Sequence, residues 1–240
     1  MLLPTLGGCG TTEPETETES FPRTRHLLAR PGSPTLPAPI GESALGLEVG
    51  RDGLLFVPRA YDPASPLPLY VFLHGATANA ESGRAMSYLA DDDRAIVLIP
   101  ESREATWDMI RGRVGPDVAF LERALQHTFD RCAVDPTRIA LAGHSDGATY
   151  ALSLGVSNGE LFTHLIGHSP GGLDRVEPRE VPRVFVSHGD KDRILPVWIS
   201  RDEIVPDLTE LGYDVEYLQY DGGHGLPFSV AQAAAEWFLA

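Results

Sequence analysis

The stretch from Arg138 to Leu154 constrains the fold of this chain more than any other. It begins with an apolar run of strand-forming residues, continues with Gly-His-Ser-Asp-Gly at 143–147 and ends in an Ala- and Leu-rich segment typical of a helix. A serine on so sharp a turn has a strained backbone, and side chains two residues away on either side would collide with it. Glycine at 143 and 147 removes those collisions, so the hydroxyl of Ser145 can stand clear of the edge of a sheet.

The flanking sequence decides between this interpretation and an ordinary turn of small residues, because Gly-x-Ser-x-Gly also arises by chance. Continuous apolar runs at 69–75 and 95–100 predict strands that helices cover on both faces. A helix is predicted over 116–129, with proline in its first turn and apolar residues along one face. Further strands are predicted at 54–58, 139–142, 165–167, 184–188 and 215–220, and further helices at 148–154, 197–211 and 230–239.

This alternation of strands and helices predicts an α/β fold with a mostly parallel, twisted sheet flanked by helices. Pro206 should kink the helix at 197–211 or split it in two, because proline cannot donate the backbone hydrogen bond that a helix interior needs. No insertion between the predicted elements is long enough to form a separate lid domain.

Composition argues against several classes of function. The 240 residues are 42% hydrophobic, which suits one sizeable domain. The net charge of −15, from 19 basic and 34 acidic residues, argues against nucleic acid and anionic lipid as partners. The two cysteines, Cys9 and Cys132, cannot build a disulfide framework or a thiol cluster. The sequence shows no phosphate-binding glycine loop, nucleotide fingerprint or metal-ligand cluster, so we expect neither a cofactor nor a metal.

Residues 1–39 are predicted to form a disordered tail and linker, and residues 40–240 the folded domain. The Thr- and Glu-rich tract at 11–19 cannot bury a core, and four prolines between 31 and 39 predict an extended linker or a surface strap. Leu-Gly-Gly-Cys at 6–9 resembles a bacterial lipobox, which implies a lipid anchor on Cys9, although the apolar stretch before it is short for a signal peptide. We therefore expect an exported protein, lipid-anchored in the cell envelope or secreted, with its translation start upstream of Met1; a cytoplasmic protein is the alternative.

Two polar loops downstream of Ser145 could complete a catalytic site. One follows the strand at 184–188 and carries two acids, Asp190 and Asp192; the other follows the last strand and carries His224. Both loops lie at the carboxyl ends of strands, where open α/β sheets bind ligands. A serine hydroxyl needs a base to become a nucleophile, and the base needs a carboxylate to orient it. Of the eight histidines, His224 alone follows both acids and ends a strand.

Five motifs in a fixed order make a family resemblance specific. They are Leu-His-Gly at 73–75, Pro-Asp-Val-Ala-Phe-Leu at 116–121, Val-Asp-Pro-Thr-Arg-Ile at 134–139 leading into 143–147, His-Gly-Asp-Lys-Asp at 188–192 with Pro196, and Gly-Gly-His at 222–224 with Pro227. Over residues 54–240 the chain resembles a lidless serine esterase of the α/β-hydrolase superfamily. It is most similar to the phospholipase/carboxylesterase and polyhydroxybutyrate-depolymerase/feruloyl-esterase group.

The resemblance implies that Ser145 is the nucleophile, His224 the base and Asp192 the acid that orients it. Asp192 is preferred because it holds the fourth place of a Gly-x-x-Asp pattern that starts at Gly189. Asp190 is then a turn residue or a capping acceptor. These assignments predict a triad of side chains contributed by three separate loops.

The resemblance also implies an oxyanion hole formed by the backbone N–H groups of Ala76, in the loop after the third strand, and Asp146, directly after the nucleophile. The Asp146 side chain has two alternatives: unpaired in the cleft it disfavours anionic substrates, and turned away it caps the following helix. Trp107 is either an apolar wall for the acyl or alcohol group or a packed core residue. His168 ends a strand and could line the substrate cleft.

Together these observations predict a serine-dependent carboxylic ester hydrolase that acts through an acyl-enzyme. Without a lid, its open cleft could accept bulky or polymeric esters, such as a polyester, a polyhydroxyalkanoate or a feruloyl ester. The same triad also serves a thioesterase or a peptidase, so the triad cannot choose among these substrates. The alternative from another class is a non-catalytic hydrolase fold that is used for binding.

Overall fold

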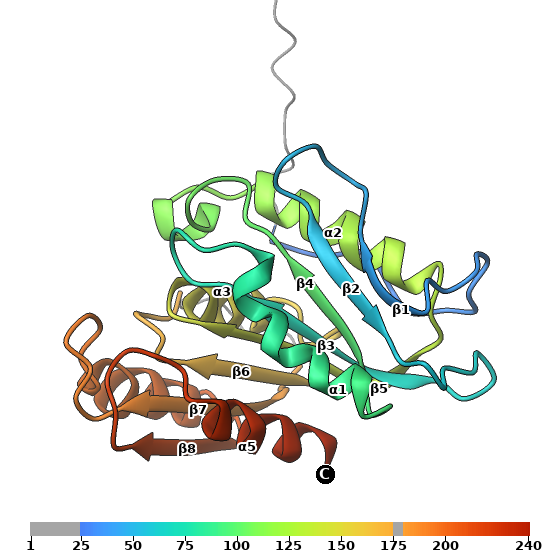
Figure 1. The fold of residues 1–240 in the computed structure, drawn as a ribbon. Coiled ribbons are helices and arrows are strands. Elements are labelled where there is room, and N and C mark those ends of the chain that lie inside the picture. The colour runs from blue at the N-terminus through green and yellow to red at the C-terminus, as the bar shows by residue number, and fades with distance from the viewer. Residues whose placement is uncertain (1–24, 175–179) are drawn as a thin grey trace, which may run out of the picture.

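The computed structural model describes residues 25–174 and 180–240, which form an eight-stranded sheet with helices on both faces (Figure 1). The strand order is β1-β2-β4-β3-β5-β6-β7-β8. β2 pairs antiparallel with β1 and with β4, whereas every neighbouring pair from β4 to β8 is parallel. The predicted mostly parallel sheet flanked by helices is confirmed. The strands are β1 (Gly41–Ala44), β2 (Gly53–Val57), β3 (Leu67–Leu73), β4 (Ile96–Pro100), β5 (Val134–His144), β6 (His164–His168), β7 (Arg183–Gly189) and β8 (Val215–Tyr220).

Alternating side chains of the central strands build two cores, one on each face of the sheet. In β3, Leu69 and Val71 pack with α2 and α3, whereas Tyr70 and Phe72 pack with α1 and α5 on the opposite face. The two-residue repeat of a strand produces this alternation, and both sets are apolar because helices cover both faces. The helical segments are η1 (Ala80–Ser87), α1 (Tyr88–Asp91), η2 (Asp108–Arg111), α2 (Pro116–Phe129), α3 (Asp146–Gly155), η3 (Ile199–Ile204), α4 (Val205–Glu210) and α5 (Phe228–Leu239).

The segment 25–39 packs on the domain as a strap, although the predicted boundary of the folded part lies at residue 40. Leu27 and Ala29 are buried in the core beside α2 and α3, and the N–H of Leu27 donates to Asn158 Oδ1 at 2.8 Å. The prolines that follow prevent regular secondary structure but leave these apolar side chains free to pack. Residues 1–24, with the predicted tail and the lipid anchor at Cys9, lie outside the described residues.

Most predicted elements are present, and the differences have local causes. The predicted helix at 116–129 coincides with α2 and the strand at 215–220 with β8. β5 begins at Val134 rather than 139, because Val134 pairs with Leu67 of β3 before the register shifts. The predicted helix at 197–211 is divided into π-helical η3 and α4, and Pro206 lies in the first turn of α4, just after the change from one helix type to the other. Among residues 25–174 and 180–240, no helix is both long and apolar enough to cross a membrane.

Candidate active site

Three side chains meet at the carboxyl ends of β5, β7 and β8. The Oγ of Ser145 lies 2.8 Å from Nε2 of His224, and Nδ1 of the same imidazole lies 2.7 Å from Oδ2 of Asp192. The ionised carboxylate can only accept, so Nδ1–H donates to it and Nε2 is left to accept the serine hydroxyl proton. Parallel strands carry their carboxyl ends to one edge of the sheet, which is why residues 79 and 32 positions apart come together.

Ser145 sits on the sharp turn that its flanking glycines predict. Its backbone lies at φ 58° and ψ −124°, a conformation that L-residues rarely adopt. A Cβ on Gly143 would approach the carbonyl oxygen of Gly147 to 2.3 Å, and a Cβ on Gly147 would approach the carbonyl oxygen of Leu73 to 2.3 Å. Both contacts involve backbone atoms that cannot move aside. The turn therefore requires glycine at both positions.

Asp192 is held as a carboxylate by donors on both of its oxygens. Its Oδ1 accepts the N–H groups of Ile194 at 2.8 Å and Leu195 at 2.9 Å, while Oδ2 faces His224. Burial raises the pKa of Asp192, but the hydrogen bonds from His224 and from these two backbone groups outweigh burial and lower its pKa below the ordinary value. Asp190, the other candidate acid, is exposed and accepts the N–H of Gly222 at 3.2 Å in the loop instead.

His144 contacts both the main chain and the ring of His224, and this contact was not predicted from the sequence. Its Nε2 donates to the carbonyl oxygen of His224 at 2.7 Å, and the two rings lie 5.1 Å apart. Burial lowers the pKa of His144 and favours the neutral ring that this single donation needs. Its place directly before the serine was the one available signal, since it puts His144 in the same turn as the nucleophile.

The segments that carry the predicted oxyanion donors approach each other closely at Ser145. A Cβ on Gly75 would lie 3.3 Å from the Cβ of Ser145, so the loop after β3 passes directly beside the serine. The backbone N–H groups of Ala76 and Asp146 donate to no other residue within the described ranges. Both groups therefore remain free for a substrate oxygen, as an oxyanion hole requires.

The side chain of Asp146 is turned away from the cleft, as in the second alternative considered from the sequence, but its hydrogen bond is to Thr106 rather than to the N-terminus of α3. Its Oδ2 accepts the hydroxyl of Thr106 at 2.6 Å, it makes no capping hydrogen bond to α3, and it does not line the cleft. The loop between β4 and α2 thus reaches across to the first residue of α3. Sequence reasoning had no signal for this contact, which joins residues 40 positions apart.

The serine opens into an apolar cleft of about 490 Å³. Phe72, Met86 and Leu226 form part of its wall, and two exposed residues, Ile194 and Phe228, stand at its rim with 69% and 50% of their surface accessible. Among the described residues that line the cleft there is no Asp, Glu, Lys or Arg. The cleft therefore suits an uncharged group and offers no cation to bind an anionic one.

The two predicted substrate-binding side chains lie in the core, which corrects that expectation. Trp107 is fully buried, its Nε1–H donates to the carbonyl oxygen of His74 at 2.8 Å, and its ring packs against Tyr150. His168 is also fully buried and is hydrogen-bonded through Nδ1 to Ser187 Oγ at 2.7 Å. Burial lowers the pKa of His168 to about 3, so its ring is neutral. Neither residue lines the cleft.

The described residues include no metal-binding cluster, and their one cysteine is buried. Within residues 25–174 and 180–240, no group of three His, Cys, Asp or Glu side chains is placed to hold a metal ion. Cys132 is buried, and burial raises the pKa of its thiol to about 12, so it packs as a small apolar side chain.

Comparison with known proteins shows the family and the fold. The model of the Esterase family ("Putative esterase") matches residues 47–182. Feruloyl esterase C of Emericella nidulans is 24% identical over 231 residues, covering 80% of this chain and 84% of that protein. A thermostable esterase of known structure is 26% identical with a TM-score of 0.67, covering 82% of this chain and 61% of the other. MGS-M1, an α/β-hydrolase enzyme from a deep-sea metagenome, is 16% identical with a TM-score of 0.62, covering 82% and 97%.

Proposed function

Because this chain belongs to the Esterase family and is a carboxylic ester hydrolase with an α/β-hydrolase fold, we propose that it cleaves its ester through an acyl-enzyme on Ser145. The observation that carries the proposal is the unbroken series of hydrogen bonds from Asp192 through His224 to Ser145, at 2.7 and 2.8 Å. Nucleophile, base and orienting acid in hydrogen-bond contact are the arrangement that activates a serine hydroxyl.

In the first half of the reaction, His224 Nε2 takes the hydroxyl proton while Ser145 Oγ attacks the ester carbonyl carbon. The carbonyl oxygen becomes an oxyanion, and the N–H groups of Ala76 and Asp146 stabilise it. As the tetrahedral intermediate collapses, the protonated imidazole gives its proton to the departing alcohol. The acyl group then remains on Ser145 as an ester.

In the second half, His224 takes a proton from a water molecule that attacks the acyl-enzyme, and the imidazole returns that proton to Ser145 Oγ as the acid leaves. Asp192 stays ionised throughout, because its hydrogen bonds lower its pKa. Its charge stabilises the imidazolium and holds the ring with Nδ1 protonated. The carboxylate orients the base without itself taking the proton.

The cleft favours esters whose groups near the carbonyl are uncharged and apolar. Its wall is apolar, its volume is about 490 Å³, and the exposed rim residues Ile194 and Phe228 leave it open to solvent. An open entrance is compatible with bulky or polymeric esters, including a polyester, a polyhydroxyalkanoate or the feruloyl ester named for the fungal relative. The same triad would also serve a thioester or an amide, and a substrate panel decides among them.

The test is hydrolysis of p-nitrophenyl esters from acetate to decanoate by the wild type and by Ser145→Ala. We expect the variant to lose at least about 10⁴-fold in kcat, since the serine acts as one unit with the base. Turnover of a thioester and of a p-nitroanilide that carry the best acyl group then shows whether the enzyme prefers an ester, a thioester or an amide. Turnover that survives in Ser145→Ala would contradict the proposed mechanism. If the thioester is turned over faster than the matched ester, the preferred substrate is a thioester.

A further inference from the structure

Three consecutive residues of the loop between β4 and α2 bind both segments that carry the proposed oxyanion donors. The carbonyl oxygen of Ala105 accepts the N–H of Thr77 at 2.6 Å, and Trp107 Nε1–H donates to the carbonyl oxygen of His74 at 2.8 Å. Between them, Thr106 Oγ1–H donates to Oδ2 of Asp146 at 2.6 Å. The loop after β3 and the start of α3 are thus tied to one tripeptide that does not itself line the cleft.

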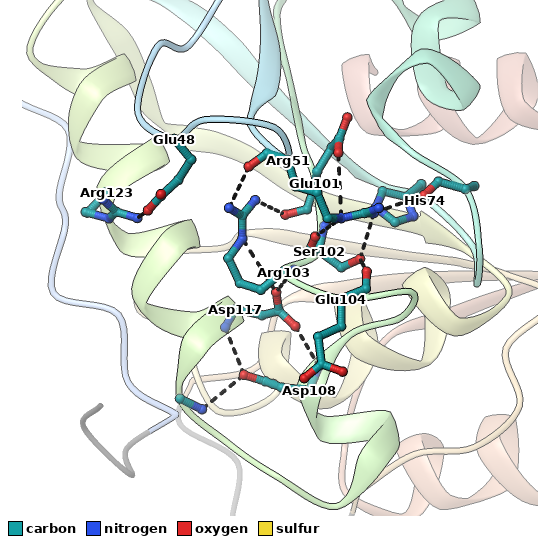
Figure 2. A network of polar contacts seen from close by, with 12 residues as sticks. Glu48, Arg51, His74, Glu101, Ser102, Arg103, Glu104, Asp108, Asp117 and Arg123 are labelled. Atoms are coloured by element: carbon teal, nitrogen blue, oxygen red, sulfur yellow. Dashed lines mark hydrogen bonds and ion pairs between the residues drawn. The ribbon is translucent and has the colours of Figure 1, made fainter. Parts of the chain in front are cut away.

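This tripeptide rests on a loop with a buried polar network (Figure 2). Asp117, in the first turn of α2, accepts the N–H of Arg103 at 2.5 Å with Oδ1 and the N–H of Asp108 at 2.6 Å with Oδ2. Asp108 in turn accepts the N–H groups of Gly115 and Asp117 at 3.0 and 2.9 Å. The guanidinium of Arg103 lies 3.5 Å above the ring of Phe120. Residues on both sides of the tripeptide are therefore anchored to α2.

The same loop also holds the imidazole of His74. The backbone N–H of Ser102 donates to His74 Nε2 at 3.1 Å, and this fixes the other ring nitrogen, Nδ1, as the protonated one, which lies 2.7 Å from the carbonyl oxygen of Gly75 (Figure 2). With the bond from Trp107, the β4–α2 loop binds His74 through both its ring and its main chain. The position of Ala76, two residues later, depends on these contacts.

Asp146 presents an electrostatic difficulty that its neighbour Thr106 resolves. The N–H of Asp146 is a proposed oxyanion donor, yet the same residue carries a carboxylate, and a negative charge beside a developing oxyanion raises the barrier. In the structure the carboxylate is turned toward Thr106, and it contributes nothing to the cleft surface. A charge-assisted hydrogen bond of 2.6 Å is of the strong kind, so it can hold the side chain in that orientation.

We propose that Thr106 is a positioning residue for ester hydrolysis. Its hydroxyl holds the Asp146 carboxylate against the β4–α2 loop, which keeps the charge away from the oxyanion and fixes the backbone N–H of Asp146 relative to that of Ala76. The inference rests on the proposed acyl-enzyme mechanism and deepens it. Thr106 acts through Asp146 and does not touch the substrate.

The test is a double-mutant cycle on p-nitrophenyl butyrate hydrolysis. Thr106→Val keeps the shape of the side chain and removes the donor, and we expect kcat to fall about tenfold with KM changed less than about twofold. Thr106→Ser keeps the hydroxyl and should recover most of the wild-type kcat. In the Asp146→Ala background, where neither the charge nor the acceptor for the Thr106 hydroxyl remains, Thr106→Val should lower kcat by less than about twofold. Thermal unfolding of each variant confirms that it is folded.

The cycle distinguishes positioning from general destabilisation. Equal losses for Thr106→Val in both backgrounds, an unchanged kcat in the wild-type background, or failure of Thr106→Ser to restore activity would each overturn the inference. Failure of the proposed mechanism gives a different result, because Ser145→Ala would then retain turnover whatever Thr106 does. If turnover depends on Ser145 but not on Thr106, the mechanism stands and this inference alone falls.

Discussion

The two sides of the cleft are built in different ways. On the side of β7 and β8, Asp192 and His224 bond directly to the serine or to each other, so the proposed reacting groups are themselves the structural links. On the side of β3 and the start of α3, the proposed donors are backbone N–H groups. Residues outside the cleft, such as Thr106 and Trp107, bind the segments that carry these donors. The first side depends on the identity of a few side chains, whereas the second depends on the conformation of a loop.

The sharpest contrast is expected from Asp192→Asn on the triad side. The asparagine can still accept the N–H groups of Ile194 and Leu195, but its amide would face His224 Nδ1 and favour the wrong tautomer. We expect kcat for p-nitrophenyl butyrate to fall about 10³–10⁴-fold without loss of folding. Asp190→Asn, in the same loop, is the matched control and should stay within about twofold of the wild type. Similar losses in the two variants would contradict the assignment of Asp192.

Two buried carboxylates, one on each side, should respond to pH in opposite directions. Burial raises the pKa of Asp117 to about 6, despite its bonds from the N–H groups of Arg103 and Asp108, whereas the pKa of Asp192 is lowered. Between pH 4 and pH 6 the folded protein therefore keeps a proton on Asp117 that the unfolded chain has lost, and stability falls as pH rises. Asp192 is ionised in both states above about pH 5, and its contribution to stability is lost only at lower pH, as the unfolded chain and then the folded protein take up a proton there.

Urea unfolding of the wild type, Asp117→Asn and Asp192→Asn from pH 4 to pH 7 measures this difference. The stability advantage of the wild type over Asp117→Asn should shrink by about 2–3 kcal/mol as pH rises, because the shift is about two pKa units. Its advantage over Asp192→Asn should stay nearly constant above about pH 5 and be lost only at lower pH. If the stability difference from the wild type changes with pH in the same way for both variants, the pKa values of Asp117 and Asp192 are not shifted in opposite directions.

A smaller effect is expected from Trp107→Phe on the oxyanion side. The change leaves the buried carbonyl oxygen of His74 without its donor, which should lower the free energy of unfolding by about 1–3 kcal/mol. We expect kcat to fall about three- to tenfold because the loop before Ala76 loosens. Trp237→Phe is the matched control, since its indole nitrogen has no hydrogen-bond partner among the described residues and the change removes no hydrogen bond. Equal changes in kcat for both variants would contradict the claim that Trp107 positions the loop before Ala76.

The same contrast explains which parts could be predicted from sequence. Strands, α2 and the triad side follow from local patterns: glycines two residues from Ser145, and an acid and a histidine in loops directly after strands. Thr106 carries no such pattern, and the motif at 116–121 that contains Asp117 does not say what its carboxylate binds, because both roles come from contacts made only after β4, α2 and α3 pack together. His168, at a strand end, and Trp107, in the loop after β4, were considered as cleft residues for a related reason: position along the chain does not say which way a side chain points. The structure selects the packed core position for Trp107, which was the other alternative, and buries His168 as well.

The measurement that tests the central claim most directly is covalent labelling of the folded wild type with a fluorophosphonate, followed by intact-mass analysis and peptide mapping. We predict one adduct per chain, located on Ser145, with loss of ester hydrolysis in proportion to labelling, and no adduct on Ser145→Ala. An adduct on a different residue, or a folded wild type that hydrolyses esters while Ser145 stays unlabelled, would contradict the proposed acyl-enzyme mechanism.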